Sequence, residues 1–134
     1  MLDVGDIVTY KRNTTREYEI SRVEWVDGQV LYKGYDSNTM NSTHLSQESD
    51  FTLVRPVETH RGQYMVGDDV LVSCYKPIRD MRTTITPTQP IRGTIICRYI
   101  NALRICSHII EFDDNTRGIV NEDDMKCLTT YSLF

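Results

Sequence analysis

The sequence lacks a long apolar run and a recognisable export signal. No uncharged apolar stretch approaches the length of a membrane-spanning helix. Residues 1–5 (MLDVG) lack the positive charge and the apolar segment with which a signal peptide begins. We therefore expect an intracellular protein, cytoplasmic or nuclear, that makes no contact with a membrane.

Motifs for catalysis and for metal binding are missing as well. The 4 cysteines include no Cys-x-x-Cys pair, and without an export signal we expect them to be reduced thiols. Cys106 and His108 carry zinc-binding atoms, but their spacing is not that of a zinc motif. No Gly-rich phosphate loop and no Ser/His/Asp arrangement is present. The sequence therefore predicts no enzymatic activity, no cofactor and no metal.

The chain also lacks the excess of positive charge that is typical of proteins that coat DNA, because its net charge is −4. Basic residues nevertheless gather in two places, near residues 11–16 and in the proline-containing segment 76–92. Nucleic-acid binding therefore stays an alternative. The residues that would carry it are Lys11, Arg12, Arg16, Lys76, Arg79, Arg82 and Arg92.

What the sequence does contain is a series of short strand patterns with turn residues between them. In the first half, alternating apolar residues predict strands at 7–10, 17–26, 30–35, 39–43 and 51–54. Asp27-Gly28 is a strong two-residue hairpin signal, and the break in alternation between Ile20 and Val23 predicts a bulge. Residues 11–16 are expected to be a hairpin loop and residues 44–46 a short helical turn. No long amphipathic helix is indicated.

The second half repeats parts of the first. Val4-Gly5-Asp6 recurs as Val66-Gly67-Asp68, and the spacing from Tyr32 to Leu45 equals that from Phe112 to Met125. Strands are predicted at 70–72, 93–99, 107–112, 117–120 and 127–128, with a helical turn at 123–125 and a long loop at 76–92. We therefore expect an all-β chain of two small units, at 1–57 and 64–134, joined by a polar linker.

These motifs resemble the Tudor family. The likeness lies in Val-Gly-Asp followed by a strand and a hairpin, then in Tyr32-Lys33-Gly34-Tyr35, and in Ile110-Glu111-Phe112-Asp113-Asp114 of the second half. The two matches cover the chain from about Val4 to Leu128, apart from the linker and the proline-containing loop. The resemblance implies two SH3-like, Tudor-like β-barrels in tandem.

The resemblance also implies a binding site in the first unit. Many Tudor domains hold methylated lysine or arginine in an aromatic cage, and several ring faces around one cation attract it while tolerating its methyl groups. By position, the rings would be Tyr10, Tyr18, Tyr32 and Tyr35, with Ser37 and Asn38 near the ligand. In the second unit Val72 replaces the first ring and only Phe112 remains of the third-strand pair, so we expect no complete cage there.

Three functions follow as hypotheses. The first is a non-enzymatic adaptor that binds a cationic peptide side chain, methylated or not, in the first unit. On this hypothesis Tyr32→Ala should abolish binding and leave thermal unfolding nearly unchanged. The second is a nucleic-acid-associated SH3-like or KOW-like protein, and the third is a small accessory protein, for instance of viral origin, that docks on a protein partner. Against the first, tyrosine is a common strand residue, so the four rings could be sheet surface.

Overall fold

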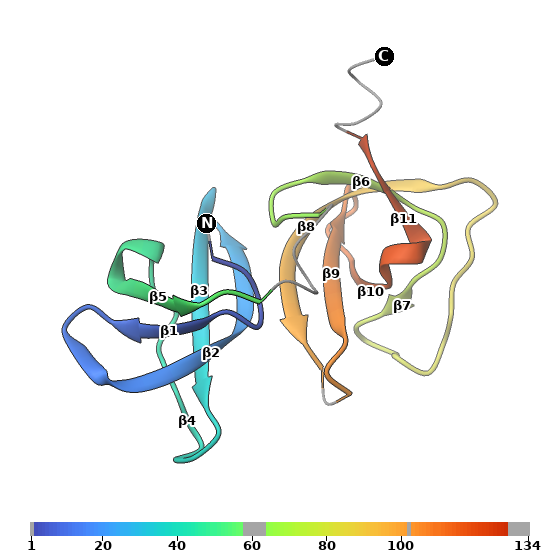
Figure 1. Cartoon of the computed structure of the whole chain (residues 1–134). Coiled ribbons are helices and arrows are strands. Elements are labelled where there is room, and N and C mark those ends of the chain that lie inside the picture. The colour runs from blue at the N-terminus through green and yellow to red at the C-terminus, as the bar shows by residue number, and fades with distance from the viewer. Residues whose placement is uncertain (1, 58–63, 102, 129–134) are drawn as a thin grey trace. The chain divides into compact units, whose positions relative to one another are not determined.

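The computed structural model describes residues 2–57, 64–101 and 103–128. These residues form β-strands and 3-10 turns, and the fold is all-β (Figure 1). The chain divides into two compact units. Unit 1 comprises residues 1–62 together with 99–106, and unit 2 comprises residues 63–98 and 107–134. The hairpin segment 99–106 thus groups with unit 1, whereas the sequence pattern assigned all of 64–134 to the second unit.

Unit 1 is an antiparallel sheet with the strand order β5-β1-β2-β3-β4. Its elements are β1 (Ile7–Tyr10), β2 (Asn13–Val26), β3 (Gln29–Asp36), β4 (Asn41–Ser42), the 3-10 turn η1 (Glu48–Asp50) and β5 (Phe51–Arg55). Its core consists of buried apolar side chains from each long strand, among them Val8, Ile20, Val23, Tyr32 and Phe51.

Unit 2 repeats this order as β11-β6-β8-β9-β10 and adds β7 beyond β10. Its elements are β6 (Asp69–Val72), β7 (Lys76–Pro77), β8 (Ile91–Ile100), β9 (Cys106–Phe112), β10 (Arg117–Val120), the 3-10 turn η2 (Glu122–Asp124) and β11 (Met125–Cys127). The last two residues of β8 and the first residue of β9 group with unit 1. Among the described residues no strand ladder joins β4 to β5 or β10 to β11, so neither sheet closes on itself. No helix in the described part of the chain is long and apolar enough to cross a membrane.

The two Val-Gly-Asp motifs form the same turn. Gly5 and Gly67 have φ values of 90° and 91°, in the region that favours glycine. Their backbone N–H groups donate to the carbonyls of Ile20 and Ile95, each at 2.7 Å. The turn therefore ties the start of each unit to its long strand, and the sequence repeat is also a structural one.

Several boundaries differ from those the sequence predicts. Residues 13–16 belong to β2 rather than to a loop, because a strand with both faces exposed at its end needs no apolar alternation. Residues 44–46 form no helical turn, since the backbone of Ser46 bonds to that of Tyr32 in both directions, at 2.8 and 2.9 Å. The turn comes later, at η1, where Gln47 and Asp50 form a capping box.

The long loop of the second unit also contains paired segments. Its first residues form β7, its last residues begin β8, and a bridge between Tyr75 and Ile85 closes its first part with bonds of 3.0 and 2.8 Å. Figure 1 shows the remainder as an extended stretch between β7 and β8. The last turn and strand of the unit lie one to two residues earlier than predicted, at η2 and β11.

Other local predictions are confirmed. The register of β2 against β3 shifts between Ile20 and Arg22, so the bulge is at Ser21. Asp27 and Gly28 have φ values of 52° and 77°, which are the positive angles of a type I′ hairpin turn.

Candidate functional site

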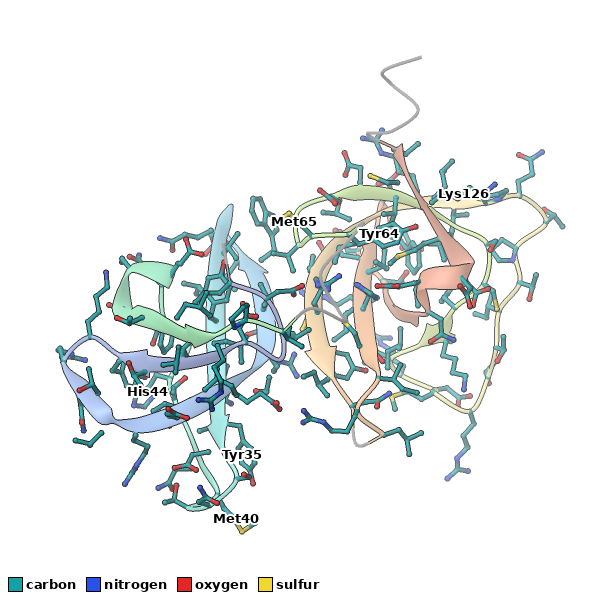
Figure 2. The ribbon with its side chains drawn as sticks, in the orientation of Figure 1. Tyr35, Met40, His44, Tyr64, Met65 and Lys126 are labelled. Carbon is teal, nitrogen blue, oxygen red and sulfur yellow. The ribbon has the colours of Figure 1, made fainter. Side chains whose placement is uncertain are left out.

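A pocket of about 430 Å³ opens on unit 1, within the range of small-ligand sites. It lies where β1 and β2 pass the end of β3 and the β3–β4 turn, and Figure 2 shows Tyr35 and Met40 in this region. The lining residues are aromatic, acidic and small polar side chains with one apolar and one basic residue: Ile7, Glu17, Tyr18, Glu19, Tyr35, Asp36, Ser37, Asn38 and Arg104.

Four of the six residues predicted for the ligand site line this pocket: Tyr18, Tyr35, Ser37 and Asn38. Tyr18 is half-buried and Tyr35 is 36% exposed, so both can offer ring surface to a ligand. Ser37 and Asn38 are exposed in the β3–β4 turn. The pocket lining therefore contains two of the four predicted rings, Tyr18 and Tyr35.

Tyr32 is not part of the pocket. Its side chain is 2% exposed and lies in the core of unit 1, and burial together with the nearby Glu48 carboxylate raises its pKa to about 12. The reason is the period of the strand, since successive side chains on a strand alternate between its faces. Tyr32 and Tyr35 are three positions apart on β3, so their side chains lie on opposite faces of the sheet, and the side chain of Tyr32 lies on the core face.

Tyr10 does not line the pocket either. Its ring stacks on Phe51 at 5.1 Å between centroids and meets the edge of Tyr18 at 5.7 Å. Because Phe51 is buried, this row of rings connects the core to the pocket wall. Tyr10 thus supports Tyr18 and does not enclose a ligand itself.

Gly34 explains how Tyr18 reaches its position. A Cβ atom at residue 34 would lie 2.8 Å from the Cβ of Tyr18 and 3.4 Å from the Cγ2 of Thr43. Only a residue without a side chain leaves room for the Tyr18 side chain, which comes from β2, to lie over β3 at this point. The glycine between the two tyrosines is therefore a packing requirement of the pocket wall.

The β3–β4 turn is fixed by Asp36. Its carboxylate accepts hydrogen bonds from the backbone N–H of Asn38 and from the hydroxyl of Thr39, both at 2.9 Å. Burial acts to raise the pKa of Asp36, but these hydrogen bonds and the charge of Arg16 outweigh it and leave the pKa below its usual value. The Asp36 carboxylate, which lines the pocket, therefore stays ionised.

The three carboxylates of the pocket each face an arginine of the same unit. Glu17 accepts a hydrogen bond from Arg55 at 2.8 Å, and Asp36 lies 3.7 Å from the Nε of Arg16. Glu19 accepts two hydrogen bonds from Arg104, at 2.6 and 2.7 Å. These acidic residues and Arg104 were not predicted as site residues, although Glu17 and Glu19 flank Tyr18 in the sequence.

The residues of the nucleic-acid alternative are scattered by comparison. Lys11 and Arg12 are exposed at the β1–β2 turn, and Lys76, Arg79 and Arg82 are exposed in unit 2. Arg16 and Arg92 are engaged with carboxylates, Arg92 with Asp69 at 3.1 Å. Within each unit, part of the predicted basic set is thus neutralised by neighbouring acids.

Unit 2 contains a buried polar cluster where the sequence showed only zinc-binding atoms. His108 is fully buried, and its Nε2 lies 2.9 Å from Nη1 of Arg98, which also donates to the carbonyl of Tyr64 at 2.7 Å. Tyr64 in turn donates to the carbonyl of Met125 at 2.9 Å and lies inside the unit, as Figure 2 shows. No group of His, Cys, Asp and Glu among the described residues could hold a metal ion.

No family model, curated protein or solved structure matches the chain.

Proposed function

We propose that this chain is a non-enzymatic binding module, and that the pocket of unit 1 takes a cationic side chain, lysine or arginine with or without methyl groups, from a protein partner. The observation that carries the proposal is that two tyrosine rings and three carboxylates line one pocket. Ring faces attract a cation through their quadrupole, and carboxylates attract it through charge. Among the lining residues three carboxylates stand against one arginine, so the pocket disfavours an anionic ligand.

The proposed architecture is a pair of SH3-like, Tudor-like barrels. It is supported by the common strand order of the two units, by the common Val-Gly-Asp turn and by a 3-10 turn before the last strand of each unit. Unit 2 would serve mainly as a structural partner or as a second contact surface, because Phe112 is buried against Tyr75 at 4.6 Å between ring centroids.

A peptide array that carries lysine, arginine and their methylated forms tests the proposal. We expect the wild-type protein to bind a subset of these peptides, and Tyr35→Ala to weaken that binding about tenfold, while Tyr35→Phe retains most of it. Glu19→Gln should also weaken binding, because it removes a pocket carboxylate.

The matched control is Glu24→Gln on the same strand. Glu24 also pairs with an arginine, Arg22 at 3.2 Å, but it does not line the pocket. Its removal should leave binding unchanged. Absence of binding to every peptide of the array would exclude the proposed function.

The nucleic-acid alternative predicts a different pattern. It requires an affinity for DNA or RNA that decreases steeply with salt and weakens when Arg79 and Arg82 are changed to glutamate. On the proposed function, the same two changes in unit 2 leave peptide binding unaffected, because neither residue lines the pocket.

A further inference from the structure

Arg104 reaches the pocket from a part of the chain remote from the other lining residues. It lies in the turn between β8 and β9, within the segment 99–106 that belongs to unit 1. Its guanidinium donates to both carboxylate oxygens of Glu19, at 2.6 and 2.7 Å. Two parallel N–H···O bonds are the strongest arrangement of this pair, and they raise the pKa of Arg104.

The turn is built to present this side chain. The carboxamide oxygen of Asn101 accepts from the N–H groups of Leu103 and Ile105 at 2.9 and 3.1 Å, and Arg104 N–H donates to the Asn101 carbonyl at 2.9 Å. Arg104 itself has φ of 64°, an angle that favours glycine over side chains with a Cβ. A strained backbone thus carries the one arginine that the pocket lining contains.

The contact is also easily reversed. The Arg104 side chain is 66% exposed, and exposed ion pairs add little net stability even when their geometry is good. The flanking Leu103 and Ile105 are 77% and 54% exposed, so they bury little apolar surface that would hold the turn in place.

The two arginines that pair with the other pocket carboxylates differ from Arg104 in this respect. Arg16 is part of β2 and Arg55 is part of β5, so both are carried by strands of the sheet itself. Arg104 alone among the three is on a turn, and its side chain can leave Glu19 while β1, β2 and β3 stay in place.

We propose that Arg104 is an internal competitor for the cation site of unit 1. In the absence of ligand its guanidinium binds the Glu19 carboxylate beside Tyr35. A cationic side chain of the partner binds to Glu19 by displacing the guanidinium. This inference rests on the proposed function and adds its regulation, because any event that moves Arg104 away from Glu19 opens the site.

Titration of the full chain with N-acetylarginine amide and with N-acetyltrimethyllysine amide, followed by NMR at the backbone amides of Tyr35 and Asn38, tests the proposal. We expect Arg104→Ala to bind these probes about two- to fivefold more tightly than wild type, the range that an exposed ion pair supplies. The affinity of Arg104→Lys should lie between those of wild type and Arg104→Ala, because lysine keeps the charge and loses the paired hydrogen bonds.

The matched control is Arg117→Ala. Arg117 is 56% exposed and donates to Glu111 at 3.0 Å, so it is a similar ion pair away from the pocket. Its removal should leave both affinities unchanged. In the wild-type protein the Arg104 Nη–H groups donate to Glu19, and saturation with probe should move their signal to the position that it has in Glu19→Gln.

The outcomes separate the two proposals. If wild type binds a probe as tightly as Arg104→Ala and the Arg104 signal does not move, Arg104 does not compete with the ligand. The proposed function then still stands. Failure of both proteins to bind either probe overturns both. Tighter binding by Arg104→Ala together with the moved signal supports both.

Discussion

Tyr32 and Tyr35, three residues apart on β3, lie on opposite sides of the sheet of unit 1. Tyr32 is 2% exposed and packs in the core, whereas Tyr35 is 36% exposed and lines the pocket opposite Glu19 on β2. The two tyrosines of this short motif thus have different roles. Tyr32 contributes to stability, and Tyr35 contributes to the proposed recognition.

This division predicts opposite effects of two alanine substitutions. Tyr32→Ala should lower the free energy of unfolding of unit 1 by about 3 kcal/mol or more, because it leaves a large cavity in the core. Tyr35→Ala should lower it by less than about 1 kcal/mol, since the ring is partly exposed. Urea unfolding followed by circular dichroism measures both changes.

Tyr32→Phe is the control, because it keeps the ring and removes only the hydroxyl. The free energy of unfolding of Tyr32→Phe should stay close to that of wild type. A Tyr32→Ala protein with unchanged stability would contradict the placement of Tyr32 in the core of unit 1.

A second prediction concerns Gly34. Gly34→Ala should destabilise unit 1 by about 1–3 kcal/mol and displace Tyr18, because the new methyl group would lie 2.8 Å from the Cβ of Tyr18. The ring signals of Tyr18 in NMR spectra should shift along with the loss of stability. Lys33→Ala, at the preceding position, should leave those signals in place, and a Gly34→Ala protein with unshifted Tyr18 signals would contradict the packing argument.

The strands and the repeat could be read from the sequence because they depend on local patterns. Asp27-Gly28 sets a type I′ turn wherever it occurs between two strands, and Val-Gly-Asp recurs with the same turn in each unit. The all-β prediction is confirmed for this reason. Closure of each unit into a barrel depends on contacts between distant strands, and the structure shows open sheets.

The composition of the pocket was harder to predict, because it depends on a register that the bulge changes. Counting back from the Asp27-Gly28 turn without a bulge would place Ile20 opposite Tyr35. The extra residue at Ser21 puts Glu19 there instead. Arg104 was beyond prediction altogether, since nothing in the local sequence connects it with residue 19.

A third prediction uses the two copies of the Val-Gly-Asp turn. Asp6 is fully buried, and its carboxylate accepts from the N–H groups of Asp3 and Val57 at 2.9 and 2.8 Å. Asp68 is half-buried, and its carboxylate accepts from Met65 at 3.0 Å. Asp6→Ala should therefore lower the free energy of unfolding by about 2–3 kcal/mol, and Asp68→Ala should lower it by about 1 kcal/mol.

Hydrogen exchange of individual amides checks this ranking. Exchange of the Val57 amide should accelerate in Asp6→Ala and that of the Met65 amide in Asp68→Ala. Equal losses of stability in the two variants would show that the turns do not differ in burial as the structure indicates.

The last prediction concerns pH and the buried His108 of unit 2. Burial and the positive charge of Arg98 lower the pKa of His108 from 6.5 to about 3. Glu122 lies 3.9 Å from Nε2, but burial and Arg98 outweigh it, so the imidazole is neutral and accepts a hydrogen bond from Arg98. In the unfolded chain the same side chain takes up a proton near pH 6.5.

The pKa of His108 is lower in the folded chain than in the unfolded chain. The stabilisation by neutral His108 is therefore complete above pH 6.5 and is lost as the pH falls towards 3. The loss is at most about 1.4 kcal/mol per pH unit within that window. Urea unfolding at pH 7.5, 6 and 4.5 should show a steeper decline for wild type than for His108→Gln, which has no imidazole to protonate. His44→Gln, which changes an exposed histidine, should follow wild type. Parallel pH profiles for wild type and His108→Gln would mean that His108 titrates alike in the folded and unfolded chains.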